Sequence, residues 1–171
     1  MERGEPIIEF RDFSFQYNAQ MEPTLYDIDL TIRKGEKVLI AGPSGCGKST
    51  LVNCINGLIP FSYKGEIKGS LKIKGEESSS QSISRISNTV GTVLQDSDAQ
   101  FIGMTVLEDI AFALENECVI KEEMVERVNR AAKIVDISEH LGYPPTDLSG
   151  GQKQRTGIAG ILVDDVEVML F

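Results

Sequence analysis

Residues 42–49 read GPSGCGKS, so three glycines and a lysine follow directly after the apolar run VLIA at residues 38–41. Glycine lets successive backbone N–H groups face one point without side chains between them, which a loop needs when it surrounds a densely charged phosphate chain. The spacing matches the pattern G-x-x-x-x-G-K-[ST]. It predicts a strand over 38–41, a phosphate-binding loop, and a helix over 48–55 that ends at Gly57.

The residue types in this loop suggest a role for each of them. Gly42, Gly45 and Gly47 leave the backbone accessible, and Lys48 supplies a positive charge for the β- and γ-phosphates of a nucleotide. The Ser49 hydroxyl is suited to coordinate Mg²⁺ beside phosphate oxygens. We expect the other residues of the segment to line the same nucleotide site: Pro43, Ser44, Cys46 and Thr50.

Composition excludes several other classes of protein. The 171 residues include 26 acidic and 17 basic side chains, and the net charge of −9 opposes any general attraction to nucleic acid or anionic lipid. No stretch approaches the roughly 18 to 20 apolar residues of a membrane span. The N-terminal MERGEPIIEF also lacks the apolar core of a signal peptide. We therefore expect a globular, cytosolic protein without a nucleic acid partner.

The cysteines and the single histidine give no sign of a metal centre. Cys46, Cys54 and Cys118 are an odd number without metal-ligand spacing, so we expect reduced thiols. Cys46 differs from the other two because Lys48 and a helix N-terminus both favour its reactive thiolate form. His140 is expected to be a surface or loop residue without a catalytic role.

Hydrophobic periodicity predicts strands that alternate with helices. Runs typical of antiparallel strands occur within the first 75 residues, at 7–17, 25–32 and 65–75. Six of the twelve residues at 76–87 are serine, which indicates an exposed loop. Further along, the pattern predicts buried strands at 89–95 and 166–171, and helices at 105–116, 121–135 and 150–163. Such alternation around a phosphate loop indicates an α/β domain with a largely parallel central sheet.

Two of these helices carry additional local signals. Thr105 and Glu108 have the spacing of a capping box at the start of the helix at 105–116. In the next helix, oppositely charged residues four positions apart are expected to pair on the exposed face: Glu123 with Arg127, and Glu126 with Arg130.

A second glycine-containing motif, LSGGQ, occupies residues 148–152. Ser149 offers a hydroxyl, Gly150 and Gly151 expose backbone N–H groups, and a helix is predicted to begin there. The chain thus contains a second anion-binding helix end. Because one phosphate loop suffices for one nucleotide in Walker-type enzymes, the second motif suggests that each nucleotide lies between two subunits.

With both motifs, the chain resembles the nucleotide-binding domain of ATP-binding cassette (ABC) proteins. Residues 42–49 resemble the Walker A motif of that family, and 149–152 its signature motif, which contacts the γ-phosphate held by the opposite subunit. The resemblance implies that Tyr17 stacks on adenine and that Gln95 senses Mg²⁺ and the attacking water. It implies ATP and Mg²⁺ as cofactors, with Ser49 and Gln95 as metal-binding residues. The implied ATP-binding residues of the signature motif are Ser149, Gly150, Gly151 and Gln152.

The resemblance covers nearly the whole chain and implies a P-loop NTPase fold with a mostly parallel core sheet. It implies one incomplete ABC ATP-binding domain over 1–171, with an antiparallel β-rich part at 1–75, the loop at 42–49 and a helical subdomain at 96–148 that leads to the signature motif. In the family, the Walker B aspartate, the catalytic glutamate and a later histidine follow the strand after the signature helix. These positions lie beyond Phe171, so we expect no catalytic residue within the chain and no ATP turnover by this chain alone.

The segment QDSDAQFIGMTVLEDIAFALEN at 95–116 more closely resembles ATPases of energy-coupling-factor (cobalt-type) importers of vitamins and metal ions. This implies an ATP-hydrolysing subunit at the cytoplasmic face of the membrane that dimerises head to tail with a second ABC ATPase domain. Residues 97–116, with Phe101 and Met104, would contact an integral membrane subunit. Two alternatives remain: a soluble ABC ATPase of DNA maintenance or translation, and a cassette that binds nucleotide without hydrolysis. In this family other subunits select the transported substrate.

Overall fold

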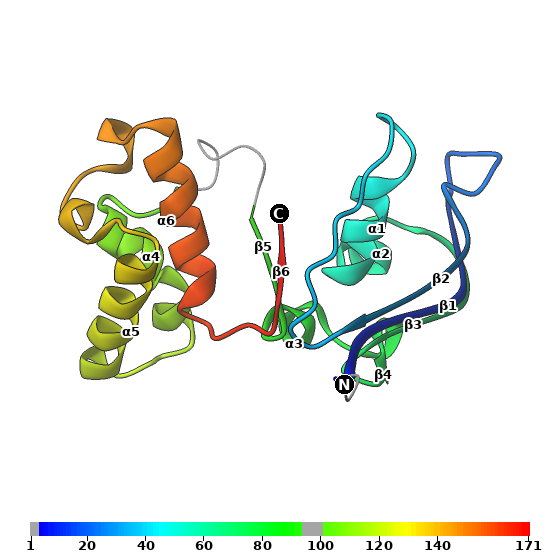
Figure 1. The fold of residues 1–171 in the computed structure, drawn as a ribbon, viewed down its shortest axis with the longest axis horizontal. Helices are drawn as coiled ribbons and strands as arrows, with labels where there is room; N and C mark the ends of the chain where they lie inside the picture. The colour runs from blue at the N-terminus through cyan, green and yellow to red at the C-terminus, as the bar shows by residue number, and fades with distance from the viewer. Residues whose placement is uncertain (1–3, 94–100) are drawn as a thin grey trace. The chain divides into compact units, whose positions relative to one another are not determined.

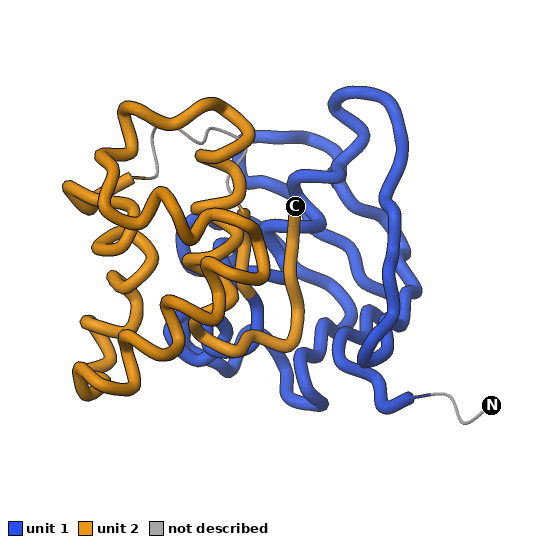
Figure 2. Tube along the Cα trace, turned by 60° about the vertical axis from the view of Figure 1, so that its left-hand side comes forward, with its two compact units in different colours: residues 1–90 blue, residues 91–171 orange. Residues whose placement is uncertain are grey.

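A computed structural model gives the fold, and it describes residues 4–93 and 101–171. The chain forms two compact units, residues 1–90 and residues 91–171 (Figure 2). That they act as one domain stays a prediction. Each unit is described by itself.

The first unit is built on a four-stranded antiparallel sheet with the strand order β2-β1-β3-β4 (Figure 1). Its strands are β1 (Pro6–Tyr17), β2 (Leu25–Arg33), β3 (Gly65–Ile73) and β4 (Glu76–Glu77). The central strand β1 pairs with both β2 and β3. The antiparallel strands predicted within the first 75 residues are therefore confirmed.

A bulge in β1 places two phenylalanines in one core. Phe10 and Phe13 are three positions apart, so an unbroken strand would point them to opposite faces. The pairing of β1 with β2 shifts register between these two residues, and Asp12 has a left-handed φ of 46° there. The bulge turns Phe13 inward, so that both rings are buried with their centroids 5.1 Å apart in edge-to-face contact.

Two helices follow the glycine loop of the first unit. Helix α1 (Lys48–Ile55) has the predicted bounds and buries an apolar face that includes Leu51, Cys54 and Ile55. Gly57 has a left-handed φ of 80°, so α1 ends where the sequence predicts, and the short α2 (Leu58–Phe61) begins.

The apolar segment at 38–41 is not a strand, contrary to the prediction. Among the described residues of the first unit, the sheet consists of β1 to β4 alone and no strand pairs with this segment. A strand needs a neighbour that shares its backbone hydrogen bonds, and an apolar sequence does not supply that neighbour by itself.

The serine-rich segment at 76–87 is more ordered than the predicted exposed loop. It contains β4, a 3₁₀ turn η1 (Ser78–Ser80) and helix α3 (Ile83–Ser87). The Ser82 hydroxyl caps α3 by accepting a hydrogen bond from the Arg85 N–H at 3.2 Å, and Ile86 is fully buried. Serine favours helix caps as well as loops, so composition did not distinguish between them.

The described residues of the second unit, together with Val90, form three α-helices and a two-stranded sheet (Figure 1). The helices are α4 (Val106–Asn116), α5 (Lys121–Ile134) and α6 (Gly150–Leu162), and the sheet pairs β5 (Val90–Thr92) with β6 (Val168–Leu170). Two 3₁₀ turns lie between α5 and α6, η2 (Ser138–His140) and η3 (Pro145–Asp147). The three α-helices agree with the predicted helices, and β5 and β6 lie within the predicted strands but are shorter, whereas the 3₁₀ turns were not predicted. The β6 residues are half-buried rather than buried as predicted, and within the described ranges β6 pairs with β5 alone.

The helices of the second unit share one apolar core. Its main contributors are Val106, Ile110, Leu114, Val128, Ala131, Ala132, Ile137, Leu148, Ala159 and Val163. The predicted capping box is confirmed at the start of α4, where Thr105 Oγ1 accepts a hydrogen bond from the Glu108 N–H at 3.2 Å. The Thr105 N–H donates to Glu108 Oε2, also at 3.2 Å, so both ends of the box are formed.

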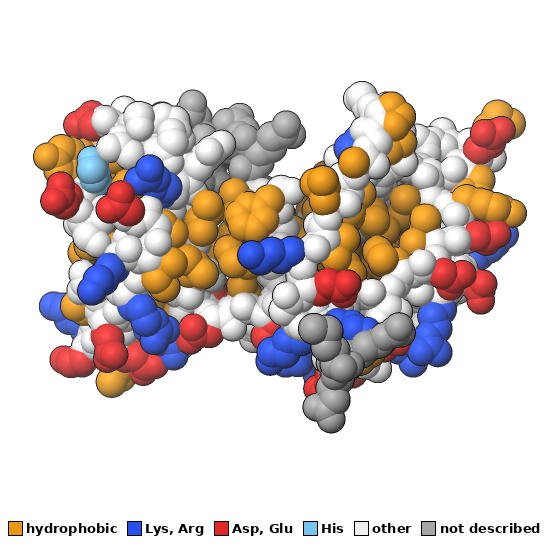
Figure 3. Space-filling view, viewed as in Figure 1, with side chains coloured by type: hydrophobic (Ala, Val, Ile, Leu, Met, Phe, Trp, Pro, Cys, Tyr) orange, Lys and Arg blue, Asp and Glu red, His pale blue; other side chains and the backbone are white. Residues whose placement is uncertain are grey.

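Acidic and basic side chains are mixed on the face of the second unit that Figure 3 shows. The predicted pair of Glu123 and Arg127 forms at 2.5 Å. Arg130, however, pairs with Asp165 at 3.3 Å, so its predicted pairing with Glu126 is wrong. Arg130 thus pairs with a carboxylate that follows α6, and not with the carboxylate of Glu126 on its own helix. In the described parts of the chain, every helix is too short or too polar to cross a membrane.

Candidate nucleotide-binding site

The first cradle comprises residues 42–50, the glycine loop and the first turn of α1. Gly45 and Gly47 have left-handed φ values of 81° and 97°, which other residues rarely adopt. Gly47 is the N-cap of α1, and no side chain of the described residues caps the helix there. The first backbone N–H groups of α1 are therefore available to donate hydrogen bonds to an anion. This agrees with the predicted phosphate-binding loop.

Lys48 places its charge at the loop itself. Its Nζ donates hydrogen bonds to Gly42 O at 2.9 Å and to Pro43 O at 2.8 Å, and it lies 3.8 Å from Cys46 Sγ. The loop is also closely packed, because a Cβ atom at Gly42 would lie 2.7 Å from Cys46 Sγ. A side chain at position 42 would therefore force Cys46 Sγ to move.

Tyr17 is linked to the first cradle by a hydrogen bond. Its hydroxyl lies 3.2 Å from Oγ1 of Thr50, which is buried in the first turn of α1. Its ring meets Phe15 edge to face with centroids 4.7 Å apart, and Tyr63 in the same manner at 6.5 Å. The structure thus brings the predicted adenine residue and the phosphate loop together. It adds the exposed Tyr63, which no sequence signal linked to Tyr17.

Ser49 is the described part of the predicted Mg²⁺ site. It is exposed on the first turn of α1, next to Lys48. In the described ranges, no group of three or more His, Cys, Asp and Glu side chains could hold a metal ion. Mg²⁺ is commonly held by one or two protein oxygens together with substrate phosphates and water, so a single hydroxyl fits this ion. The other predicted ligand, Gln95, lies outside the described residues.

The second cradle comprises residues 149–152 at the start of α6. The Ser149 hydroxyl accepts a hydrogen bond from the Gln152 N–H at 3.4 Å, and the Ser149 N–H donates to Gln152 Oε1 at 2.7 Å. This is a capping box, which fixes the first turn of the helix. Gly150 and Gly151 are exposed, and no atom lies within 4 Å of a Cβ built on either of them. Their N–H groups are accessible at the positive end of α6.

His140 contacts the second cradle, which sequence reasoning did not anticipate. Its Nε2 lies 2.8 Å from Gln152 Nε2, and its ring centroid lies 5.4 Å from that of Tyr143. His140 is half-buried at the end of the short turn η2, in the connection between α5 and α6, which agrees with a surface or loop position; its lack of a catalytic role stays a prediction. The two bonded residues are 12 positions apart across two 3₁₀ turns, so no helical or strand periodicity indicates their contact.

Two titratable groups have pKa values shifted by burial. Cys54 is buried on α1, and burial raises the pKa of its thiol to about 12. Asp164 follows α6, and burial raises the pKa of its carboxyl to about 6, with a further increase from Glu117 that Arg127 opposes. Cys54 is therefore an unreactive thiol, in contrast to the exposed Cys46.

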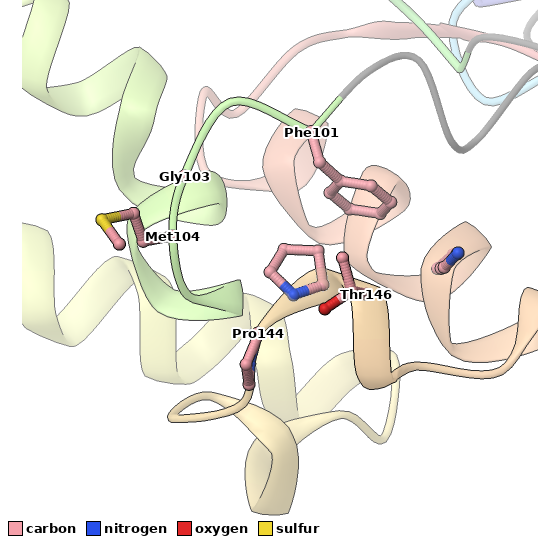
Figure 4. Close-up of a pocket in the computed structure, with 7 residues that line it drawn as sticks. Phe101, Gly103, Met104, Pro144 and Thr146 are labelled. Carbon is pink, nitrogen blue, oxygen red and sulfur yellow. The ribbon is translucent and has the colours of Figure 1, made fainter.

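A depression of about 540 Å³ opens on the second unit (Figure 4). Its lining comes from the segment before α4, the segment that includes η3, and the first turn of α6, and consists of Phe101, Gly103, Met104, Pro144, Pro145, Thr146 and Lys153. Figure 4 shows the Phe101 ring directed toward Thr146. Phe101 and Met104 belong to the predicted partner contact at 97–116, which the structure describes from residue 101 onward. Sequence periodicity gives no signal that Pro144 and Pro145 line a surface depression.

The two cradles belong to different units. Tyr17 and the first cradle lie in the first unit, and the second cradle and His140 lie in the second. Each cradle is therefore complete within its own unit as a helix N-terminus with accessible backbone donors.

Comparison with known proteins agrees with both motifs. The family model described as ABC transporter matches residues 25–171. A Clostridium perfringens protein described as an ABC transporter ATP-binding protein is 64% identical over 171 residues, which are 100% of this chain and 30% of that protein. A Streptococcus mutans protein of the same description is 58% identical over 167 residues, 98% of this chain and 30% of the relative. The chain thus spans about 30% of the length of these curated relatives.

A solved structure agrees as well. The structure of cbiO1 from Clostridium perfringens, described as part of the ABC transporter complex cbiONQ, superposes with a TM-score of 0.86 at 30% sequence identity. The superposition covers 96% of this chain and 64% of cbiO1. The fold is accordingly the P-loop fold of ABC ATPases, with an antiparallel sheet and a helical part that carries the signature motif. On its sequence, its motifs and its fold, the chain belongs to the ABC transporter family.

Proposed function

We propose that the protein containing this chain binds ATP with Mg²⁺ and hydrolyses it to drive an ABC-type importer. The pair of cradles supports this most strongly, because two glycine-containing helix N-termini, at 42–50 and 149–152, offer backbone donors to an anion. The first cradle suffices to hold the phosphates of one nucleotide. The second is then available to a nucleotide bound by another cassette.

In the first cradle, we assign each side chain a task in binding. Lys48 neutralises phosphate charge, and Ser49 supplies one oxygen to Mg²⁺, which when bound spreads the charge of the β- and γ-phosphates. Tyr17 offers the face of its ring to adenine, and its hydroxyl is anchored 3.2 Å from Thr50. Gln95 is proposed to orient the attacking water.

The second cradle is proposed to act on ATP held by a second ABC domain in a head-to-tail dimer. Alanine is favoured over glycine in a helix by roughly 0.5 to 1 kcal/mol. A Cβ at Gly150 or Gly151 would meet no atom within 4 Å, so the folding of the chain does not require glycine at these positions. Glycine at these positions instead lets an anion from outside the chain approach the backbone N–H groups closely. Ser149 and the two glycine N–H groups would then contact the γ-phosphate.

We propose the depression on the second unit as the contact for an integral membrane subunit, with the protein at the cytoplasmic face of the membrane. Its lining is largely apolar, and it includes Phe101 and Met104 of the segment that follows Gln95. The similarity to a protein described as part of an ABC transporter complex supports a partner of this kind. The resemblance of residues 95–116 to energy-coupling-factor ATPases supports a vitamin or a metal ion as the transported substrate.

Hydrolysis is tested with the full-length protein and its membrane partner in lipid vesicles. We expect MgATP-dependent phosphate release that falls to background in Lys48→Ala, because the loop then lacks its cation. Phosphate release by Lys48→Ala equal to that of the wild type would contradict the proposed activity.

Docking is tested in the same vesicles by substrate uptake. Phe101→Glu and Met104→Glu should abolish uptake while basal hydrolysis persists, because a buried charge disrupts an apolar contact. Ile102→Glu is the matched control, since Ile102 is 67% exposed and does not line the depression. Full uptake by both Phe101→Glu and Met104→Glu would place the membrane contact elsewhere.

A further inference from the structure

The side-chain amide of Gln152 has a fixed orientation. The Ser149 N–H lies 2.7 Å from Gln152 Oε1, and because a backbone N–H can only donate, the amide oxygen must face it. The amide nitrogen therefore faces His140, with 2.8 Å between the two Nε2 atoms. Since an amide NH₂ group can only donate, Nε2 of His140 must be the acceptor.

This bond fixes the state of the imidazole. With Nε2 as an acceptor, His140 is neutral and carries its proton on Nδ1. Nδ1 is buried and has no hydrogen-bond partner in the described part of the chain. A buried donor without a partner is unfavourable, and an apolar side chain of similar size would avoid that cost. The contact that distinguishes a histidine from an apolar side chain at this position is therefore the acceptor that Nε2 offers to Gln152.

The backbone on both sides of His140 is well anchored. The His140 N–H donates to Ile137 O at 2.9 Å, and Ile137 is fully buried. The Tyr143 N–H donates to His140 O at 2.9 Å, and Tyr143 O accepts from the Val106 N–H at 3.0 Å at the start of α4. His140 is thus held at a fixed place from which it can orient the mobile end of another side chain.

We propose that His140 is a positioning residue for the second cradle. Its unprotonated Nε2 holds the Gln152 amide, which accepts from the Ser149 N–H and so orients the Ser149 hydroxyl and the N–H groups that follow it. Without this acceptor the amide rotates, because the terminal torsion of glutamine is broad, and the capping box loses one of its two bonds. This inference rests on the proposed function, since it assumes that the second cradle contacts a nucleotide. His140 itself does not touch that nucleotide.

Three variants of the full-length protein test this role by kcat and KM for MgATP. His140→Phe keeps a ring but removes the acceptor, His140→Gln places an amide oxygen near Nε2, and Gly151→Asp blocks the second cradle. We expect His140→Phe to lower kcat roughly tenfold with KM unchanged, because a small misplacement of aligned groups impairs the reaction step and the first cradle is intact. His140→Gln should keep at least about half of the wild-type kcat, since the acceptor is retained.

The outcomes separate this inference from the proposed function. If Gly151→Asp abolishes turnover while His140→Phe retains it, the second cradle acts without His140 and the inference is wrong. An equal loss of kcat in His140→Phe and His140→Gln would show that the imidazole ring matters for packing. That result would also overturn the inference. Full turnover by Gly151→Asp would overturn the proposed use of the second cradle itself.

Nuclear magnetic resonance of the wild-type protein tests the same point without relying on the folding of a variant. The imidazole nitrogens of His140 are identified by the signals missing from His140→Gln. We expect Nε2 to be unprotonated and Nδ1 to be protonated. A protonated Nε2 would contradict the assigned hydrogen bond.

Discussion

The two cradles both contain glycines, but they need them for different reasons. Gly45 and Gly47 have left-handed φ values of 81° and 97°, so the first cradle requires glycine for its own conformation. Gly150 and Gly151 lie in a regular helix with open space around them. The first cradle is therefore a site complete in itself, whereas the second is shaped for something that approaches from outside.

The largest expected effect concerns the affinity of one ABC domain for MgATP. Lys48→Ala should weaken binding roughly tenfold to a hundredfold, because it removes a charge-assisted bond. Ser149→Ala should leave the affinity unchanged, since the second cradle serves another nucleotide. Equilibrium binding of a fluorescent ATP analogue measures both, with Lys37→Ala as a control for lost charge. An equal loss of MgATP affinity in Lys48→Ala and Ser149→Ala would show that both cradles bind the same nucleotide, which contradicts the proposed difference between them.

Thiol labelling probes whether the first cradle is filled by nucleotide. MgATP at saturating concentration should slow alkylation of Cys46 about tenfold, because only the nucleotide-free protein reacts. Cys118 is exposed and far along the sequence, so its rate is the internal control. Cys54 should not react, since burial raises the pKa of its thiol to about 12. Mass spectrometry after timed quenching gives all three rates, and equal rates at Cys46 with and without MgATP would contradict the assignment.

Alanine substitution should change stability in opposite directions in the two cradles. Gly47→Ala should lower the free energy of unfolding by about 1 to 3 kcal/mol, because alanine is strained at a φ of 97° and its Cβ would lie 3.0 Å from Leu25 and Thr24. Gly151→Ala should raise it by up to about 1 kcal/mol through helix propensity. Urea titration followed by circular dichroism measures both changes. A destabilised Gly151→Ala would show that glycine is needed there for folding.

The smallest expected effect is on the pH dependence of the free energy of unfolding, through Asp164 at the C-terminal end of α6. The pKa of Asp164 is raised from 3.8 to about 6, mainly by burial, so its contribution to stability is full below about pH 3.8 and is lost as the pH rises to about 6. Asp164→Asn should remove this part of the pH dependence and be the more stable protein at pH 7. Urea midpoints between pH 4 and 7 test this, and parallel curves for the two proteins would show that Asp164 does not titrate as assigned.

Sequence reasoning succeeded where a signal lies within a few residues. The start of α1, the capping box of Thr105 and Glu108, and the start of α6 at Ser149 all depend on neighbours no more than three or four positions away. The antiparallel strands were also predictable, because alternation of apolar residues identifies the buried face of a strand. The bulge at Asp12 was not predicted, although it restores the inward direction of Phe13.

Prediction from the sequence failed where a structure or a contact depends on a residue far away in the chain. The apolar residues 38–41 are not a strand because no strand of their unit pairs with them. Arg130 forms an ion pair with Asp165, which is 35 positions away, rather than with Glu126 on its own helix. The contact of His140 with Gln152 depends on how η2 and η3 fold back on α6. None of these choices is encoded in local spacing.

The order within the serine-rich segment limits where the chain accepts foreign groups. A Cβ at Gly57 would lie 2.9 Å from Ile86 Cδ1, so Ile86 of α3 packs against the turn between α1 and α2. Ser79 and Ser80, by contrast, are exposed on the turn η1. A fluorophore or an epitope inserted at η1 should leave the fold of the first unit undisturbed, whereas an insertion at Ile86 would disturb the turn that follows α1. Two positions only a few residues apart thus differ completely as attachment points.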